Sequence, residues 1–320
     1  MTRIEALLAK PGIFRVDPTA CMLHAERIRN FQAIVHSGKW SLAPKSIQLA
    51  FKTVFISICH QFNWDFLQSA LADYFFDGNV LSADVLCGLR ASDVANILAE
   101  YPKKDRIRSQ ERARILRNIG EVIRDDFNGD WDLFYATCEN SQLGTGEFHK
   151  IFDRFDGYRS DPLRKKTNVL SHDLFQEKIL TFNDSKNIHP AVDYHIMRVY
   201  LRTGRVIPID QSVFPFIQGA PNPRGTLVRA LRSAVSDAEK LTAFYSGVSI
   251  PALNYLEWQI GREICLNGDP RCTLGPSKPC AEDIYQFCGD QCPYVDVCLS
   301  KTLLPSFLSF EEPNYVSTDY

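Results

Sequence analysis

The chain has 320 residues, of which 45% are hydrophobic, 12% aromatic and 23% charged. These values are typical of a compact globular protein and exclude a disordered, collagen-like or disulfide-stapled miniprotein. No apolar run approaches the roughly 20 residues that a membrane span needs, and the start of the chain has no signal-type apolar region. We therefore expect a soluble, cytoplasmic protein that does not associate with membranes.

Charge is unevenly distributed along the chain, although the formal net charge is only −2. Residues 281–320 hold seven acidic residues against one lysine, so residues 1–280 carry a net charge of +4, from 35 basic and 31 acidic groups. The segment 103–124 is rich in basic residues, with eight Lys and Arg residues against three acidic ones. Such a segment is typical of a solvated helix face, and the alternative is a surface that contacts phosphates.

Helical periodicity dominates the sequence, and the fold class that it predicts is all-α. Turn-rich joints such as Asn128-Gly129-Asp130 separate the helices, and the tail after Leu304 is expected to be loosely attached. In chain order, the predicted helices are Ala20–His36, Ser46–His60, Asp65–Phe76, Ser92–Tyr101, Gln110–Asp125, Thr167–Phe182, Pro190–Thr203, Thr226–Phe244 and Pro251–Leu266.

The helix predicted over Pro190–Thr203 carries an acidic residue near its start. Pro190 suits the first turn of a helix, and Gly204 suits its C-cap. One face is expected to be buried, through Val192, Ile196, Val199 and Thr203. Asp193 lies off that face in the first turn, where the helix dipole and the free N–H groups favour an ionised carboxylate. Taken alone, such a residue is an ordinary stabilising end charge.

The pattern of residues 191–204, Ala-Val-Asp-x-His-x-x-Arg-Val-x-x-Arg-x-Gly, has a close counterpart. It resembles the segment that bears the essential aspartate in helix-hairpin-helix DNA glycosylases of the endonuclease III type. The resemblance implies that Asp193 is the catalytic carboxylate. Cleavage of an N-glycosidic bond develops positive charge on the sugar, which a fixed carboxylate stabilises. Tyr194, next to Asp193, is the expected stacking partner of the flipped base.

Other segments resemble the same family in the same chain order. Residues 164–169, Arg-Lys-Lys-Thr-Asn-Val, are similar to the exit from the family's hairpin, where bifunctional members carry a Schiff-base lysine; that role falls on Lys166. Residues 111–116 resemble the helix before the hairpin, and residues 57–61 resemble an early segment that ends in a DNA-wedging glutamine, Gln61. The resemblance further implies DNA contacts from Arg112, Arg159 and Lys165.

The hairpin itself departs from the family. Where the family reads Leu-Pro-Gly-Val-Gly, with glycines that let backbone N–H groups approach a phosphate, residues 155–163 contain a single glycine. The interval from Lys166 to Asp193 is also longer than in the family. A nucleophilic lysine needs tightly held geometry and a deprotonated amine. We therefore expect a monofunctional enzyme that uses water, and the alternative is a bifunctional one in which Lys166 attacks the sugar.

Six of the ten cysteines fall between Cys265 and Cys298, which indicates a metal or cluster site. Residues 261–272 resemble the entry to the [4Fe-4S] loop of the same glycosylase branch, and the last two cysteines again have the family's spacing. The implied cluster ligands are Cys265, Cys272, Cys292 and Cys298. An alternative set could bind zinc through Cys280, Cys288, Cys292 and Cys298.

The resemblance implies a two-lobed helix-hairpin-helix glycosylase fold. One lobe would span residues 45–165 and end in the altered hairpin, and the other would combine residues 1–44 and 166–264. A cysteine-rich loop, 265–298, and a tail, 299–320, would follow, and the base pocket would lie between the lobes. The implied activity is excision of a modified base from double-stranded DNA, by a protein that we expect to be a monomer.

The residues do not specify which base is removed. One hypothesis is a hypermodified base, such as glucosylated phage cytosine, excised in antiviral defence. The chain also resembles, more diffusely, the queuosine-nucleoside hydrolases, which share the helical architecture and an Asp-Tyr dipeptide. A third hypothesis is a DNA-binding module without catalysis. Release of a base from duplex DNA, compared with release from a free nucleoside, distinguishes the three.

Overall fold

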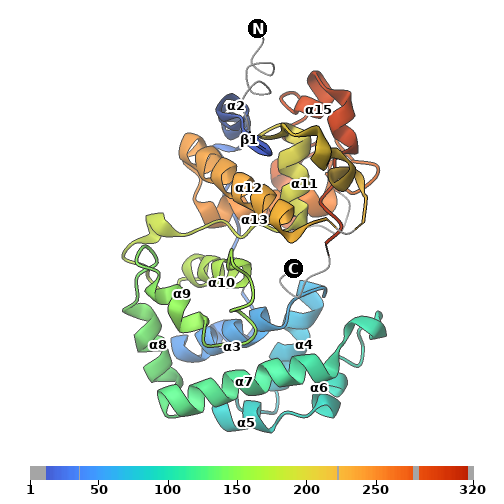
Figure 1. The fold of residues 1–320 in the computed structure, drawn as a ribbon. Helices are drawn as coiled ribbons and strands as arrows, with labels where there is room; N and C mark the ends of the chain where they lie inside the picture. Colours follow the sequence, from blue (N-terminus) through green and yellow to red (C-terminus); the bar gives the residue numbers. More distant parts are fainter. Residues whose placement is uncertain (1–11, 36, 222, 277–280, 316–320) are drawn as a thin grey trace. The chain divides into compact units, whose positions relative to one another are not determined.

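The computed structural model describes residues 12–35, 37–221, 223–276 and 281–315, and the fold is predominantly helical (Figure 1). The chain divides into two compact units. The middle unit is Val35–Ile188, and the terminal unit comprises the described residues before Val35 together with those from His189 to Tyr315. None of the described helices combines the length and the apolar character that a transmembrane span requires. The prediction of a helical fold is therefore confirmed at the level of fold class.

The middle unit is built around one buried helix, α3. Eleven of its 13 residues are buried, and α4, α7, α8 and α10 all pack against it. The elements of this unit are η1 (Lys39–Leu42), α3 (Lys45–Ser57), α4 (Trp64–Phe76), α5 (Ala83–Gly88), α6 (Ala91–Ile97), η2 (Lys104–Arg106), α7 (Ser109–Phe127), α8 (Trp131–Glu139), α9 (Glu147–Phe152), α10 (Lys165–Gln176) and η3 (Ser185–Asn187).

Helix α7 is long because its apolar residues recur at helical spacing on one face, through Ile115, Ile119 and Ile123. It ends at Asn128, which adopts the left-handed conformation common after a helix. Its contact with α5 is close, because a Cβ on Gly120 would lie 2.7 Å from the Ala83 carbonyl oxygen. A larger residue at position 120 would force α5 away from α7.

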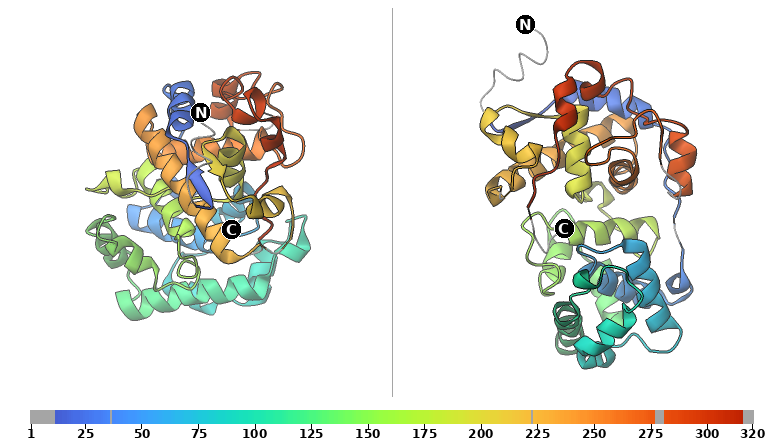
Figure 2. Two further views of the ribbon diagram at one scale, coloured as in Figure 1. Left: turned by 45° about the horizontal axis from the view of Figure 1, so that its top comes forward. Right: turned by 90° about the vertical axis from the view of Figure 1, so that its right-hand side faces the viewer.

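The terminal unit packs three helices, α11, α12 and α13, side by side, with α2 against α12 (Figures 1 and 2). A short antiparallel sheet pairs Arg15 of β1 with Ile207 of β2. The elements are β1 (Phe14–Val16), α2 (Pro18–Ile28), α11 (Tyr194–Thr203), β2 (Val206–Pro208), η4 (Gln211–Gln218), α12 (Gly225–Ser246), α13 (Ile250–Glu263), α14 (Glu282–Cys288), α15 (Leu299–Thr302) and η5 (Pro305–Ser309).

The unit boundaries differ from those expected, since the middle unit begins at Val35 rather than at residue 45 and ends at Ile188 rather than at residue 165. Residues 166–188 belong to the middle unit, because α10 packs along α3 and Lys52 on α3 forms an ion pair with Asp173 on α10 at 3.0 Å. The prediction of a loose tail after Leu304 is wrong for the described residues. Phe307 and Phe310 are buried, and Arg202 on α11 donates to the Phe310 carbonyl oxygen at 2.7 Å.

Candidate functional site

Asp193 is the N-cap of α11, which begins at Tyr194 rather than at Pro190. Its Oδ1 accepts a hydrogen bond from the Ile196 backbone N–H at 3.0 Å, and the side chain is only 4% exposed. The backbone of the first helical turn therefore fixes the carboxylate, and the positive end of the helix dipole stabilises its charge. The predicted buried face of this helix is confirmed, since Val192, Ile196, Val199 and Thr203 are all buried.

An aromatic side chain lies next to this carboxylate in sequence. Tyr194 is 40% exposed, and its ring centre lies 4.1 Å from that of His195. The His195 Nδ1 in turn lies 3.0 Å from Arg198 Nη2, one turn further along α11. Tyr194 thus offers an exposed ring at the start of the helix, as stacking on a flipped base requires.

Another buried acid of this unit, Glu239 on α12, was not expected from the sequence. Its Oε1 accepts a hydrogen bond from Asn254 at 2.8 Å, while Oε2 is buried with no partner among the described residues. Burial raises the pKa of Glu239 to about 8; the negative charges of Glu257 and Asp193 add to this effect, while the hydrogen bond from Asn254 opposes it. Glu239 is therefore protonated at neutral pH, and its charge state depends on that of Asp193.

The raised pKa of Glu239 predicts a pH dependence of stability. The folded protein holds the Glu239 proton more tightly than the unfolded chain does. The contribution of this proton to the free energy of unfolding is therefore fully present below pH 4.5, and it is lost as pH rises through about 8. Glu239→Gln should flatten the fall in the free energy of unfolding between about pH 5 and 9, a difference on the order of a few kcal/mol. Urea unfolding over this pH range measures it. The same change at the exposed Glu26 serves as control, and a parental slope in Glu239→Gln would contradict the prediction.

In the middle unit, Lys166 lies in the first turn of α10 and is only 6% exposed. Its Nζ donates to the Ser57 carbonyl oxygen at 2.7 Å and lies 3.5 Å from His60 Nδ1. Burial, together with the positive charges of Lys166 and Arg112, lowers the pKa of His60 to about 2. His60 is therefore neutral and can accept a hydrogen bond from the lysine. The structure gives Lys166 a buried, well-held amine, with a neutral imidazole beside it.

Two of the predicted DNA contacts are not surface charges. Arg112 is fully buried and donates to the His60 carbonyl oxygen at 2.9 Å, with its guanidinium over the ring of Phe62. Burial also lowers the pKa of Arg112, to about 10. Lys165 is buried as well, in the first turn of α10. The structure does not expose Arg112 or Lys165 as a phosphate contact requires, because both residues are packed into the core of the middle unit.

The other two residues of this unit that are predicted to contact DNA are Gln61 and Arg159, and Arg159 is the more exposed of the two. Gln61 is half-buried in the turn after α3, with φ of 55°, an uncommon conformation for a residue other than glycine. The Arg159 side chain is 61% exposed and forms an ion pair with Asp156 at 2.7 Å. Residues 155–163, the altered hairpin, consist mostly of turns. Gly157 comes so close to α3 that an added Cβ would lie 2.8 Å from the Ser57 Cβ.

The four cysteines of the preferred ligand set line one small pocket, which we call the cysteine pocket. All four, Cys265, Cys272, Cys292 and Cys298, are buried. Burial raises the pKa of the Cys272, Cys292 and Cys298 thiols, and the neighbouring thiolates add to the effect. Thiols in this setting ionise most readily when a cationic centre supplies compensating charge.

The cysteine-rich segment supplies most of the walls of the cysteine pocket, and α11 supplies one side of it. Val199, Arg202 and Thr203 line it, and Arg202 Nη1 lies 3.7 Å from the Cys265 sulfur. Gly204, with φ of 75°, ends α11 and lets the residue after Cys298 approach, because an added Cβ would meet Leu299 at 2.4 Å. The helix that Asp193 caps therefore also positions the cysteines at its other end.

Two cysteines belong only to the alternative set. Cys288 is buried in the surrounding core but does not line the cysteine pocket, and Cys280 lies outside the described residues. Within the described residues, no set of three or more His, Cys, Asp or Glu side chains is placed to hold a metal ion. In a [4Fe-4S] cluster each cysteine binds a different iron, so such a cluster requires four thiols around a shared pocket. The preferred set fits that donor pattern.

Metal content separates the two ligand sets. Anaerobically purified protein should be brown and contain about four irons per chain, as a [4Fe-4S] cluster requires. Cys272→Ser should lose most of that iron, whereas Cys288→Ser should retain it, because only Cys272 faces the cysteine pocket. Elemental analysis and visible absorption measure both. Stoichiometric zinc without iron, or iron loss in Cys288→Ser alone, would overturn the assignment.

Each unit thus contains a different set of the predicted site residues. Asp193, Tyr194 and the four cysteines belong to the terminal unit, and Lys166, Gln61 and Arg159 belong to the middle unit. Comparison of the chain with known protein families gives no match, and comparison with curated proteins gives none either.

Proposed function

We propose that the chain is a DNA glycosylase that excises a modified base from double-stranded DNA by cleaving its N-glycosidic bond. The observation that carries this proposal is the organisation of α11. Asp193 caps its first turn, and its last turn lines the pocket of four cysteines. The predicted carboxylate and the predicted cluster ligands come from segments far apart in sequence, yet one ten-residue helix joins them.

The chemistry assigned to Asp193 follows from its fixed position. Loss of the base leaves positive charge on the sugar, and a carboxylate already oriented by the Ile196 N–H stabilises that charge without rearranging. The same carboxylate can orient the attacking water. Tyr194, exposed beside it, would stack on the flipped base.

We assign Cys265, Cys272, Cys292 and Cys298 as ligands of a [4Fe-4S] cluster. When bound, such a cluster supplies a stable cross-link between distant segments and a redox-active centre. Three contacts within the chain hold the ligand cysteines in place. Arg202 approaches the Cys265 sulfur, Ser300 Oγ lies 3.2 Å from the Cys298 sulfur, and the Cys292 N–H donates to the Cys272 carbonyl oxygen at 2.9 Å.

Lys166 is assigned a positioning role rather than a nucleophilic one, so the enzyme is proposed to be monofunctional. Its amine already donates to the Ser57 carbonyl oxygen, and attack on the sugar would require that bond to break. The large, hypermodified bases of phage DNA, removed in antiviral defence, are the substrate class that we propose to test first.

Strand cleavage assays on modified duplexes test this function. The proposal expects abasic sites at the modified position, revealed as strand breaks only after heating, with no covalent adduct trapped by borohydride. An adduct that disappears in Lys166→Ala would show that the enzyme is bifunctional. Base release from free nucleosides but from no duplex would support a nucleoside hydrolase instead.

A further inference from the structure

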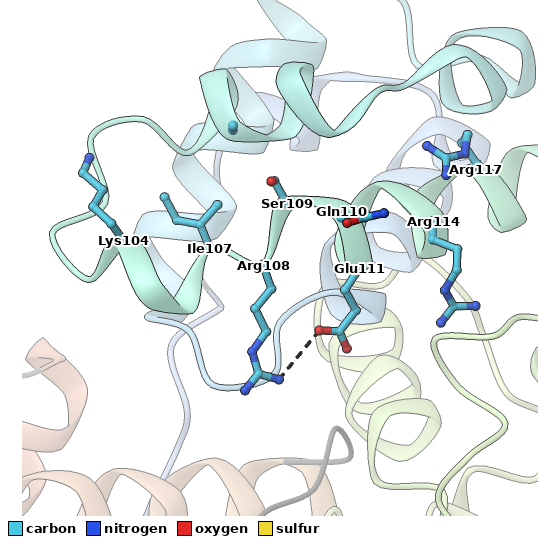
Figure 3. Close-up of a pocket in the computed structure, with 9 residues that line it drawn as sticks. Lys104, Ile107, Arg108, Ser109, Gln110, Glu111, Arg114 and Arg117 are labelled. Atoms are coloured by element: carbon cyan, nitrogen blue, oxygen red, sulfur yellow. Dashed lines mark ion pairs between the residues drawn. The ribbon is translucent and has the colours of Figure 1, made fainter.

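A basic pocket lies in the middle unit, between η2 and the first turns of α7 (Figure 3). Its volume is about 770 Å³, and four cationic side chains line it against the single carboxylate of Glu111. Lys104 lies at one end of the pocket and Arg114 and Arg117 lie at the other, with Arg108 between them (Figure 3). None of the described residues that line the pocket is aromatic.

Neighbouring groups hold these cations in place without neutralising all of them. Arg108 Nη1 lies 3.7 Å from Glu111, and Arg117 donates to the neutral Leu89 carbonyl oxygen at 2.8 Å. Arg114 forms an ion pair with Asp156 at 2.5 Å and keeps 59% of its side chain exposed. Since Asp156 also pairs with Arg159, one carboxylate serves two exposed arginines, and the pocket retains net positive charge.

The backbone at the start of α7 adds to this positive field. Arg108 is the N-cap in a left-handed conformation, with φ of 43°, and no side chain caps the helix. The Arg108 side chain therefore does not satisfy the N–H groups at the start of the helix. An anion in the pocket would accept from them and would interact favourably with the dipole of a 19-residue helix.

We propose that this pocket binds a phosphate group of the DNA backbone. The proposal rests on the proposed glycosylase function and deepens it, by naming a backbone contact that is separate from the altered hairpin. Planar guanidinium groups such as those of Arg108 and Arg114 match phosphate oxygens in pairs. The Asp156 bridge ties Arg114 to Arg159 of the hairpin, so the bound strand would continue from the pocket towards that segment.

Salt-dependent DNA binding tests the proposal. Fluorescence anisotropy with a labelled duplex should give a salt slope about two units smaller for Arg108→Gln/Arg114→Gln than for the parent, because two phosphate contacts are lost. At low salt the affinity should fall by about 10- to 100-fold. The control, Lys186→Gln/Lys240→Gln, removes two exposed cations outside the pocket and should keep a slope closer to that of the parent.

The result separates this proposal from the proposed function. If Arg114→Gln disturbs folding through Asp156, Arg108→Gln alone should still reduce the slope by about one unit. A folded variant with the parental salt slope and DNA affinity would overturn the proposal. The proposal would also be overturned if the pocket bound inorganic phosphate tightly but its substitution left DNA affinity unchanged. Failure of base release would count against the glycosylase function, but it would leave the difference in DNA binding intact.

Discussion

Asp193→Asn should lower the rate of base release by a factor on the order of 10²–10³ while leaving the fold and DNA binding nearly unchanged. The substitution removes the charge that opposes the developing cation on the sugar. It keeps the helix cap, because asparagine also caps well and its amide oxygen can still accept from the Ile196 N–H. Asp193→Ala is a poorer test, since it would lose the cap as well, at a cost of about 1 kcal/mol.

The matched control is Asp130→Asn, which makes the same chemical change at the N-cap of α8. It should retain parental activity. Single-turnover kinetics on a modified duplex, with anisotropy for binding and thermal unfolding for stability, separate the effects. A rate for Asp193→Asn within a few-fold of the parent would remove Asp193 from the active site.

Glu257→Gln should destabilise the protein by about 3–5 kcal/mol, the largest effect on stability that we expect of any single substitution. The Arg205–Glu257 pair is fully buried, with N–O distances of 2.5 and 3.0 Å. Loss of the Glu257 charge would leave the buried charge of Arg205 uncompensated. Glu257 also accepts from the Tyr294 hydroxyl at 2.8 Å. Since Tyr294 lies between Cys292 and Cys298 in sequence, the loss should also loosen the cysteine-rich loop.

An exposed ion pair provides the comparison for this effect. Asp125→Asn removes the partner of Arg124 on the surface of α7, and we expect a change of about 1 kcal/mol or less. Urea unfolding of both variants gives the difference directly. Equal, small losses in the two variants would show that the buried pair is replaceable by a neutral hydrogen bond.

Long helices could be predicted from the sequence because several turns of apolar spacing reinforce one another. The short α9, with six residues, spans too few turns for such a pattern, and it forms because Phe148 and Phe152 reach the core. The attachment of the tail also depends on distant residues. The two prolines of this segment indicate a loose tail, but Arg198 and Arg202 bind Glu312 and the Phe310 carbonyl oxygen.

A motif in the sequence indicated Asp193 and the four cysteines as candidates, and the structure places the four cysteines around one pocket. The predictions from the sequence were wrong where burial decides the role of a charged group. Arg112 shares the spacing of Ile115 and Ile119, so its place on the buried face of α7 could have been read from the sequence. Glu239 likewise follows Val235 on the buried face of α12, but its interaction with Asp193 requires the packing of three helices.

Mass spectrometry of the bases released from a panel of modified duplex DNAs tests the central claim most directly. The parental protein should release one modified base and leave an abasic duplex, and Asp193→Asn should release almost none. Release of the base from the free nucleoside alone, or no release from any duplex that the protein binds, would contradict the assignment as a DNA glycosylase.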